Sequence, residues 1–162
     1  AGVLTIGLLD NADLECYDVV VVETSCTEYP DLIKALLQPI ATQGMIAYDF
    51  SDLQTTLADA KHFFIKSATG HGNERVAEAV GHIKSSLSSS MLETIRRISI
   101  LLYFNKEGEQ PLLMQEMTVL TEFLKELPEN IEVIWALYPD VTIEEHGIKL
   151  SVIAARKENI KG

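Results

Sequence analysis

Two patterns of apolar residues recur along this chain, and each predicts a different kind of secondary-structure element. Runs of apolar and β-branched residues predict buried strands, and spacings of three and four residues predict helices with one apolar face. The predicted strands lie at residues 3–9, 18–23, 61–68, 98–104, 131–138 and 147–155. The predicted helices lie at residues 28–41, 50–60, 73–87 and 111–127, with Asn73 as the cap of the third.

Turn residues and prolines predict how these elements begin, end and connect. The turn cluster 10–13 leaves too short a link for a crossover helix, so the first two strands form a hairpin or lie as two edge strands. Pro39 is expected to end or kink the first helix, and Pro111 to open the longest one. The serine-rich stretch 84–90 is expected to be a flexible loop. The last two strands, which a short acidic loop joins, are expected to pair antiparallel.

The order of the elements from residue 50 onward predicts an α+β fold. They follow one another as α-β-α-β-α-β-β, which predicts a two-layer sandwich, a mixed β-sheet with helices packed on it. A ferredoxin-like sandwich is the alternative that this pattern permits. With 162 residues the chain can bury one proper core. We divide it into a short strand pair with a connecting helix at residues 1–43 and a main domain at residues 44–162.

Composition and charge argue against several classes of function. The net charge of −11 argues against binding a nucleic-acid backbone, which needs clustered lysine and arginine. The apolar runs are too short to cross a bilayer and no secretory signal is visible, so we expect a cytoplasmic protein with no membrane partner. Cys16, Cys26 and the scattered histidines have no metal-ligand spacing, so no metal site is expected.

Two aspartates stand at the predicted start of the second helix. Asp49 directly precedes the apolar spacing of Phe50, Leu53 and Leu57, and Asp52 falls in the same first turn. A carboxylate at this place can accept the free N–H groups of the first turn and suits the positive end of the helix. A carboxylate can also orient or deprotonate a water molecule that lies within hydrogen-bond reach. The residues therefore permit either a purely structural cap or a catalytic pair.

The glycine turn between a predicted strand and the third helix is a second candidate. Helix N-termini attract anions, so Gly70, Gly72 and Asn73 are candidate ligands of a small anion. Arg75 stands where a dinucleotide fingerprint has its third glycine, and a tight strand-to-helix turn accounts better for the two glycines. No G-x-x-x-x-G-K-[ST] motif occurs in the chain, so we expect no cofactor and no GTP site within it.

In their order, these motifs resemble the junction between the two halves of the FtsZ/tubulin family. The resemblance rests on the Asp-Phe-Ser-Asp stretch at 49–52, the Thr-Gly-His-Gly-Asn-Glu-Arg stretch at 69–75, and the closing strand, and it runs over residues 44–156. It implies the two-layer C-terminal domain of that family, with the GTP-binding half largely absent. It also implies that Asp49 and Asp52 act in trans, on the GTP that a neighbouring subunit holds.

The resemblance implies a role in assembly. We expect an FtsZ-like cell-division or cytoskeletal domain that assembles with or regulates a protein partner, either an FtsZ-like filament subunit or a second copy of itself. GTP would come only from that neighbour or from an upstream domain, so the chain would not be a self-contained GTPase. The family usually has asparagine where this chain has Ala47, which bears on activation in trans. The alternatives are a trans-activator of GTP hydrolysis through the two aspartates and a stand-alone anion-binding domain.

Overall fold

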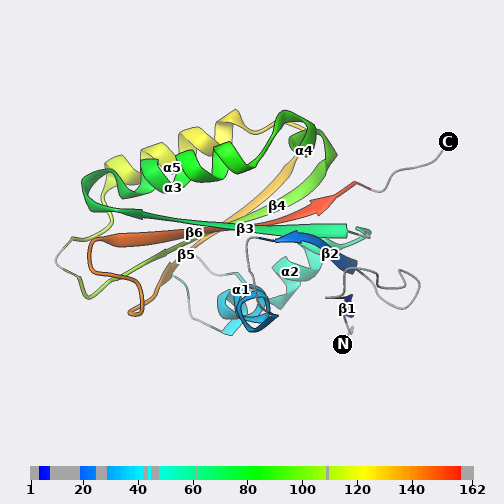
Figure 1. The fold of residues 1–162 in the computed structure, drawn as a ribbon, viewed down its shortest axis with the longest axis horizontal. Helices are drawn as coiled ribbons and strands as arrows, with labels where there is room; N and C mark the ends of the chain where they lie inside the picture. The colour runs from blue at the N-terminus through cyan, green and yellow to red at the C-terminus, as the bar shows by residue number, and fades with distance from the viewer. Residues whose placement is uncertain are drawn as a thin grey trace.

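One mixed sheet with helices on both faces organises the described part of the chain (Figure 1). The computed structural model describes residues 4–7, 19–24, 29–41, 44, 48–60, 62–108 and 110–157. The strands are β1 (Ile6–Gly7), β2 (Val19–Thr24), β3 (His62–His71), β4 (Ile95–Phe104), β5 (Glu132–Pro139) and β6 (Gly147–Arg156). The helices are α1 (Tyr29–Ala41), α2 (Phe50–Leu57), α3 (Arg75–Ser86), α4 (Ser89–Thr94) and α5 (Met114–Glu126), and a 3-10 turn, Gly72–Glu74, precedes α3.

The last strand of the chain lies in the middle of the sheet. The strand order is β1-β2-β3-β6-β4-β5, and β6 runs antiparallel to both of its neighbours, whereas the other pairs are parallel. The predicted mixed sheet is therefore confirmed. The predicted antiparallel pairing of the last two strands is wrong, because β5 pairs with β4 and the chain crosses β4 to reach its place beside β3. Strand β6 is apolar on both faces. Its place in the middle of the sheet leaves both faces covered by the helices on either side.

The first two strands extend the same sheet at one edge. Strand β1 pairs with β2 in parallel, and β2 pairs with β3 in parallel, so of the two predicted arrangements the edge strands are found and the hairpin is wrong. Residues 8–18, which connect them, lie outside the described residues. Because β2 hydrogen-bonds to β3, the described parts on either side of residue 43 share one sheet, and the division of the chain at that residue stays a prediction.

Two separate apolar cores lie on the two faces of the sheet, and β6 contributes to both. Its even positions, such as Leu150 and Val152, contact the core beneath α3 and α5, and its odd positions, such as Ile153 and Ala155, contact the core beneath α1 and α2. The α+β class and the sandwich of a mixed sheet with helices are confirmed. The two-layer arrangement describes β3 to β6 with α3 and α5, and α1 and α2 cover the opposite face (Figure 1).

Several predicted helix ends differ from those observed. Helix α1 continues past Pro39 to Ala41, because a proline in the last turn removes few helical hydrogen bonds. The serine-rich stretch is not a loop: α3 runs to Ser86, and Ser88 caps the short α4 by accepting a hydrogen bond from the Met91 N–H group at 3.2 Å. Local hydrogen bonds of serine favour helix caps as well as loops, and here they form the cap.

A buried arginine sets where α3 and α5 begin. Arg75 is fully buried, and its guanidinium donates to Glu116 Oε1 at 2.7 Å and Oε2 at 3.2 Å, which is a bidentate ion pair. It also donates to the Pro111 carbonyl at 3.0 Å, which keeps that residue outside the helix, so α5 begins at Met114 and the predicted start at Pro111 is wrong. Because the chain makes a 3-10 turn before Arg75, Asn73 does not cap α3, and that prediction is also wrong.

The glycine before this turn generates a stability prediction. A Cβ atom on Gly70 would lie 1.8 Å from the backbone oxygen of Arg75, whereas a Cβ on Gly81, within α3, meets nothing within 4 Å. We expect Gly70→Ala to lower the free energy of unfolding by about 3 kcal/mol through this backbone overlap. The matched control Gly81→Ala is expected to raise it by about 1 kcal/mol through helix propensity. Urea unfolding measures both, and equal effects of the two substitutions would contradict the account.

Candidate functional site

The two aspartates predicted at the start of α2 form a reciprocal cap there. Asp49 Oδ1 accepts a hydrogen bond from the Asp52 N–H group at 3.0 Å, and Asp52 Oδ2 accepts one from the Asp49 N–H group at 2.8 Å. The predicted cap and the predicted proximity of the two acids are confirmed. Asp49 is exposed and Asp52 is half-buried. Each carboxylate uses one oxygen in this box, and no other described residue bonds to its second oxygen, which can therefore meet a water molecule or a ligand.

Beneath this acidic turn, residues 49–52, side-chain hydroxyls connect α2 to the sheet. The Tyr48 hydroxyl lies 2.8 Å from Ser99 Oγ on β4, and Thr56 Oγ1 lies 2.7 Å from the same oxygen. The Tyr138 hydroxyl on β5 donates to the Tyr48 carbonyl at 3.2 Å. Sequence reasoning missed these residues, although one signal pointed to them, because Ser99 interrupts an otherwise apolar run at residues 98–104.

Burial keeps the tyrosines of this region in their neutral form. Burial raises the pKa of Tyr48, and its hydrogen bonds with Ser99 and Thr56 lower it by less. Burial, together with the neighbouring Tyr48, raises the pKa of Tyr138 to about 12. Both phenols therefore act as hydrogen-bond donors at neutral pH, and neither supplies a negative charge beside the aspartates.

A second polar contact ties α1 to the end of β5. Gln38 Nε2 donates to Asp140 Oδ2 at 2.6 Å, and Thr142 donates to Asp140 Oδ1 from its backbone at 2.9 Å and from its hydroxyl at 2.6 Å. Burial by itself would raise the pKa of Asp140, but the hydrogen bonds from Thr142 and Gln38 outweigh it and lower the pKa. This carboxylate is therefore ionised in the folded protein and serves to hold α1 against the sheet.

The glycine turn lies apart from the acidic turn. It joins β3 to α3 over one core, whereas the acidic turn opens α2 over the other core, so the structure does not bring the two candidate sites together (Figure 1). Gly72 has a φ of +72°, which requires glycine, as the tight-turn interpretation expects. Two N–H groups of the turn already have partners, because His71 donates to Glu78 Oε2 at 2.8 Å and Gly72 donates to the His146 carbonyl at 2.9 Å.

Asn73 lines a small pocket between α3 and α5. The pocket has a volume of about 90 Å³, and the side chains of Glu74 and Glu116 contribute acidic groups to its wall. Acidic groups repel an anion, and the turn beside them already carries the carboxylate of Glu78. An anion at Gly70, Gly72 and Asn73 stays a prediction that these surroundings do not favour.

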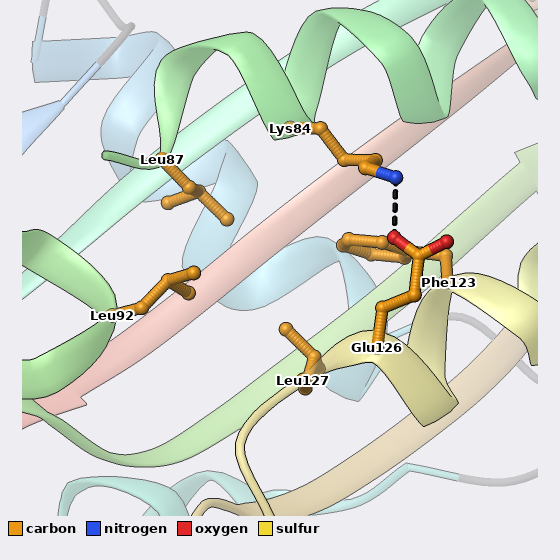
Figure 2. A pocket seen from close by; sticks show the side chains of 6 residues that line it. All are labelled: Lys84, Leu87, Leu92, Phe123, Glu126 and Leu127. Atoms are coloured by element: carbon orange, nitrogen blue, oxygen red, sulfur yellow. Dashed lines mark hydrogen bonds and ion pairs between the residues drawn. The ribbon is translucent and has the colours of Figure 1, made fainter. Parts of the chain in front are cut away.

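A more apolar pocket of about 140 Å³ lies where α3, α4 and α5 meet. Figure 2 shows three leucines and a phenylalanine around one gap, with the ion pair between Lys84 and Glu126 at its rim. The pocket is lined by Lys84, Leu87, Leu92, Phe123, Glu126 and Leu127. It lies over the core beneath α3 and α5, on the opposite face of the sheet from the acidic turn, and contains no group suited to chemistry on a nucleotide.

Among the described residues no group of three or more histidine, cysteine, aspartate or glutamate side chains is placed to hold a metal ion. No helix within the described ranges is both long enough and apolar enough to span a bilayer.

The cap generates a prediction that separates the structural role of Asp49 from its charge. We expect Asp49→Ala to lower the free energy of unfolding by about 1 kcal/mol, because the N–H group of Asp52 loses its acceptor. Asp49→Asn keeps a capping oxygen and is expected to unfold like the parent protein. Urea unfolding of both variants tests this expectation, and an equal loss in the two would show that the charge, and not the cap, stabilises α2.

The contact between α1 and β5 generates a pH-dependence prediction. A carboxylate whose pKa is lower in the folded state stabilises the protein above its unfolded pKa, and this stabilisation is lost as the pH falls through the folded value. The difference in unfolding free energy between the parent and Asp140→Asn should therefore be constant near pH 7 and shrink below about pH 4. Thr142→Val, which removes one donor to this carboxylate, should weaken the pH dependence. A difference that does not change with pH would contradict the assignment.

Comparisons with known proteins connect this chain to the cell division protein FtsZ. No family model matches the chain. The chain is 25% identical over 122 residues to the cell division protein FtsZ of Porphyromonas gingivalis, and the match covers 74% of this chain and 26% of that protein. An empty FtsZ dimer of M. jannaschii superposes with a TM-score of 0.65 at 17% identity, over 88% of this chain and 46% of the FtsZ chain. A point mutant of FtsZ from the same organism superposes with a TM-score of 0.63 at 16% identity, over 88% of this chain and 48% of that chain.

These likenesses cover only part of the relatives. The chain spans 26% of the matched FtsZ sequence and less than half of the matched FtsZ structures. The structural likeness, at under 25% identity, concerns the fold, and the sequence likeness independently points to the same proteins. The chain is therefore similar to FtsZ in sequence and has the fold of an FtsZ/tubulin-family C-terminal-like domain.

Proposed function

We propose that this chain is an FtsZ-like assembly or regulatory domain whose acidic turn contacts a nucleotide held by a neighbouring protein subunit. One observation carries the proposal: in a domain similar to FtsZ, Asp49 and Asp52 are fixed side by side at the start of α2, and Asp49 is exposed. The capping box satisfies two N–H groups of the first turn and at the same time holds the two carboxylates in one geometry.

The chemistry of this contact is that of two carboxylates beside a phosphate. Like charges repel, so Asp49 and Asp52 would not bind the phosphate oxygens directly. A water molecule between them would be oriented or deprotonated by the oxygen that the cap leaves available on each side chain. The hydrogen bonds between side chain and backbone hold both carboxylates in one geometry, which favours this role over that of flexible surface acids.

The neighbour would supply the nucleotide. The chain has no G-x-x-x-x-G-K-[ST] motif, so the GTP would be held by the partner or by an upstream domain. The partner would be an FtsZ-like filament subunit or a second copy of this chain, and the contact would take place in the cytoplasm, where such filaments assemble. Ala47, at the position where the family usually has asparagine, lies outside the described residues, so the proposal rests on the two aspartates.

Turnover of GTP by an added FtsZ tests the proposal. We expect the chain, added to GTP-loaded FtsZ from Porphyromonas gingivalis, to change the rate of phosphate release and the mass of polymer. Asp49→Asn and Asp52→Asn keep capping oxygens but remove the charge, so each should reduce a stimulated rate about a hundredfold, while co-sedimentation with the polymer persists.

The control for these variants is an acid on the opposite side of the sheet. Glu93 is exposed on α4, and Glu93→Gln removes one negative charge without touching the acidic turn. The proposal predicts parental stimulation from this variant. No change in turnover or polymer mass at a saturating concentration of the parent chain would refute the assembly role, and equal stimulation by all the variants would refute the role of the aspartates.

A further inference from the structure

The hydroxyl cluster beneath the acidic turn forms a hydrogen-bond chain with a single direction. Thr56 donates its one hydroxyl hydrogen to the Asp52 carbonyl at 2.9 Å, so it can only accept from Ser99 at 2.7 Å. Ser99 has then used its own hydrogen, so it accepts from the Tyr48 hydroxyl at 2.8 Å. The sequence of donors is therefore Tyr48, Ser99, Thr56, and the chain ends on the backbone of one of the two acidic residues.

This chain of hydrogen bonds contacts the acidic turn at both of its ends. Tyr48 directly precedes Asp49, and Tyr138 on β5 holds the Tyr48 carbonyl. At the other end the carbonyl of Asp52 is held through Thr56. Both ends meet at one atom, Ser99 Oγ, which is carried by β4, a fully paired strand of the sheet. Apart from the hydrogen bond of Tyr138, the hydroxyl contacts between the described part of the turn and the sheet therefore converge on a single serine.

The surroundings of this serine argue for a dedicated role. Tyr48, Thr56 and Ser99 are 3%, 0% and 0% exposed, and apolar residues of the core beneath α1 and α2 surround them. Burying polar groups in an apolar core costs free energy. A helix of eight residues such as α2 is not stable in water without tertiary contacts. A shared polar anchor specifies one position for α2, whereas apolar packing alone permits it to slide.

We propose that Ser99 is a positioning residue that fixes Asp49 and Asp52 in the geometry used on the neighbouring subunit's nucleotide. Ser99 touches no nucleotide itself and acts only through Tyr48 and Thr56. This inference rests on the proposed function, but the order of the acidic turn can be measured without any partner. Burial keeps Tyr48 protonated across the neutral range, so the chain retains its direction there.

The test compares two buried serines of the same sheet. Ser99→Ala breaks the chain, whereas Ser151→Ala removes a hydroxyl that lies on the same face of the sheet but pairs with Ser67 at 3.2 Å, between β3 and β6, and not with the hydroxyl cluster. We expect hydrogen exchange at the Asp52 and Leu53 amides to accelerate about tenfold in Ser99→Ala. Those amides should exchange at the parental rate in Ser151→Ala, and the amides of the β3 and β6 ladder should be unchanged in Ser99→Ala.

A triple variant covers the case in which Ser99→Ala fails to fold. Tyr48→Phe, Thr56→Val and Ser99→Ala together replace all partners by apolar groups of similar shape, which can be nearly neutral for global stability. We expect the same acceleration at Asp52 and Leu53 in this variant. Parental exchange at these two amides, or acceleration spread evenly over the whole chain, would overturn the proposal.

The functional readout separates this inference from the proposed function. With FtsZ and GTP, Ser99→Ala should lower the maximal stimulated rate about tenfold and leave the half-saturating concentration of the chain unchanged. A purely structural role would instead change the half-saturating concentration in proportion to the unfolded fraction, and that result would overturn the proposal. If Asp49→Asn does not alter stimulation, the proposed function fails, and the exchange measurement alone decides whether Ser99 fixes the turn.

Discussion

The pairing of β6 with both β3 and β4 is the constraint on which the structure depends. This strand comes last in the sequence, yet it joins the part of the sheet made by β1, β2 and β3 to the part made by β4 and β5. It is buried from Gly147 to Ala155 except at Lys149, and its two sets of alternating residues contribute to both cores. Because these contacts are far apart in sequence, the described sheet cannot be completed until residues 147–156 are in place.

The position of the acidic turn depends on the pairing of β6 with β4. Ser99, which anchors the turn, lies opposite Ile153 of β6 in the register of the sheet. The helices α3 and α5 are held together on the other face by the buried pair of Arg75 and Glu116. A rigid sheet with polar anchors at chosen points thus presents the two aspartates on one side of the molecule, and the apolar face beneath α3 and α5 serves stability.

Features that depend on nearby residues could be predicted from the sequence. The cap formed by Asp49 and Asp52 was predictable because a cap involves residues three apart. The existence and order of the described strands and of every described helix except α4 follow from the same local signals. The resemblance of the motif order to the FtsZ/tubulin family also led to the fold.

Features that depend on distant residues could not be predicted. The place of β6 depends on which two strands pair with its edges, and these strands, β3 and β4, are distant from it in sequence. The short loop before β6 favoured a hairpin with β5, which does not form. The later start of α5 depends on Arg75 reaching the carbonyl of Pro111 from another helix. The role of Ser99 depends on hydroxyls that approach from a loop and a helix, and a lone serine in an apolar strand does not reveal its partners.

Photocrosslinking from either side of the sheet tests most directly whether the side with the acidic turn contacts the neighbouring subunit. Benzoylphenylalanine is placed at position 50, where Phe50 is 40% exposed beside the acidic turn, or at position 114, where Met114 is 82% exposed at the start of α5. We expect crosslinks to GTP-loaded FtsZ from position 50 and none from position 114. Crosslinks from position 114 alone, or equal yields from both, would contradict this expectation.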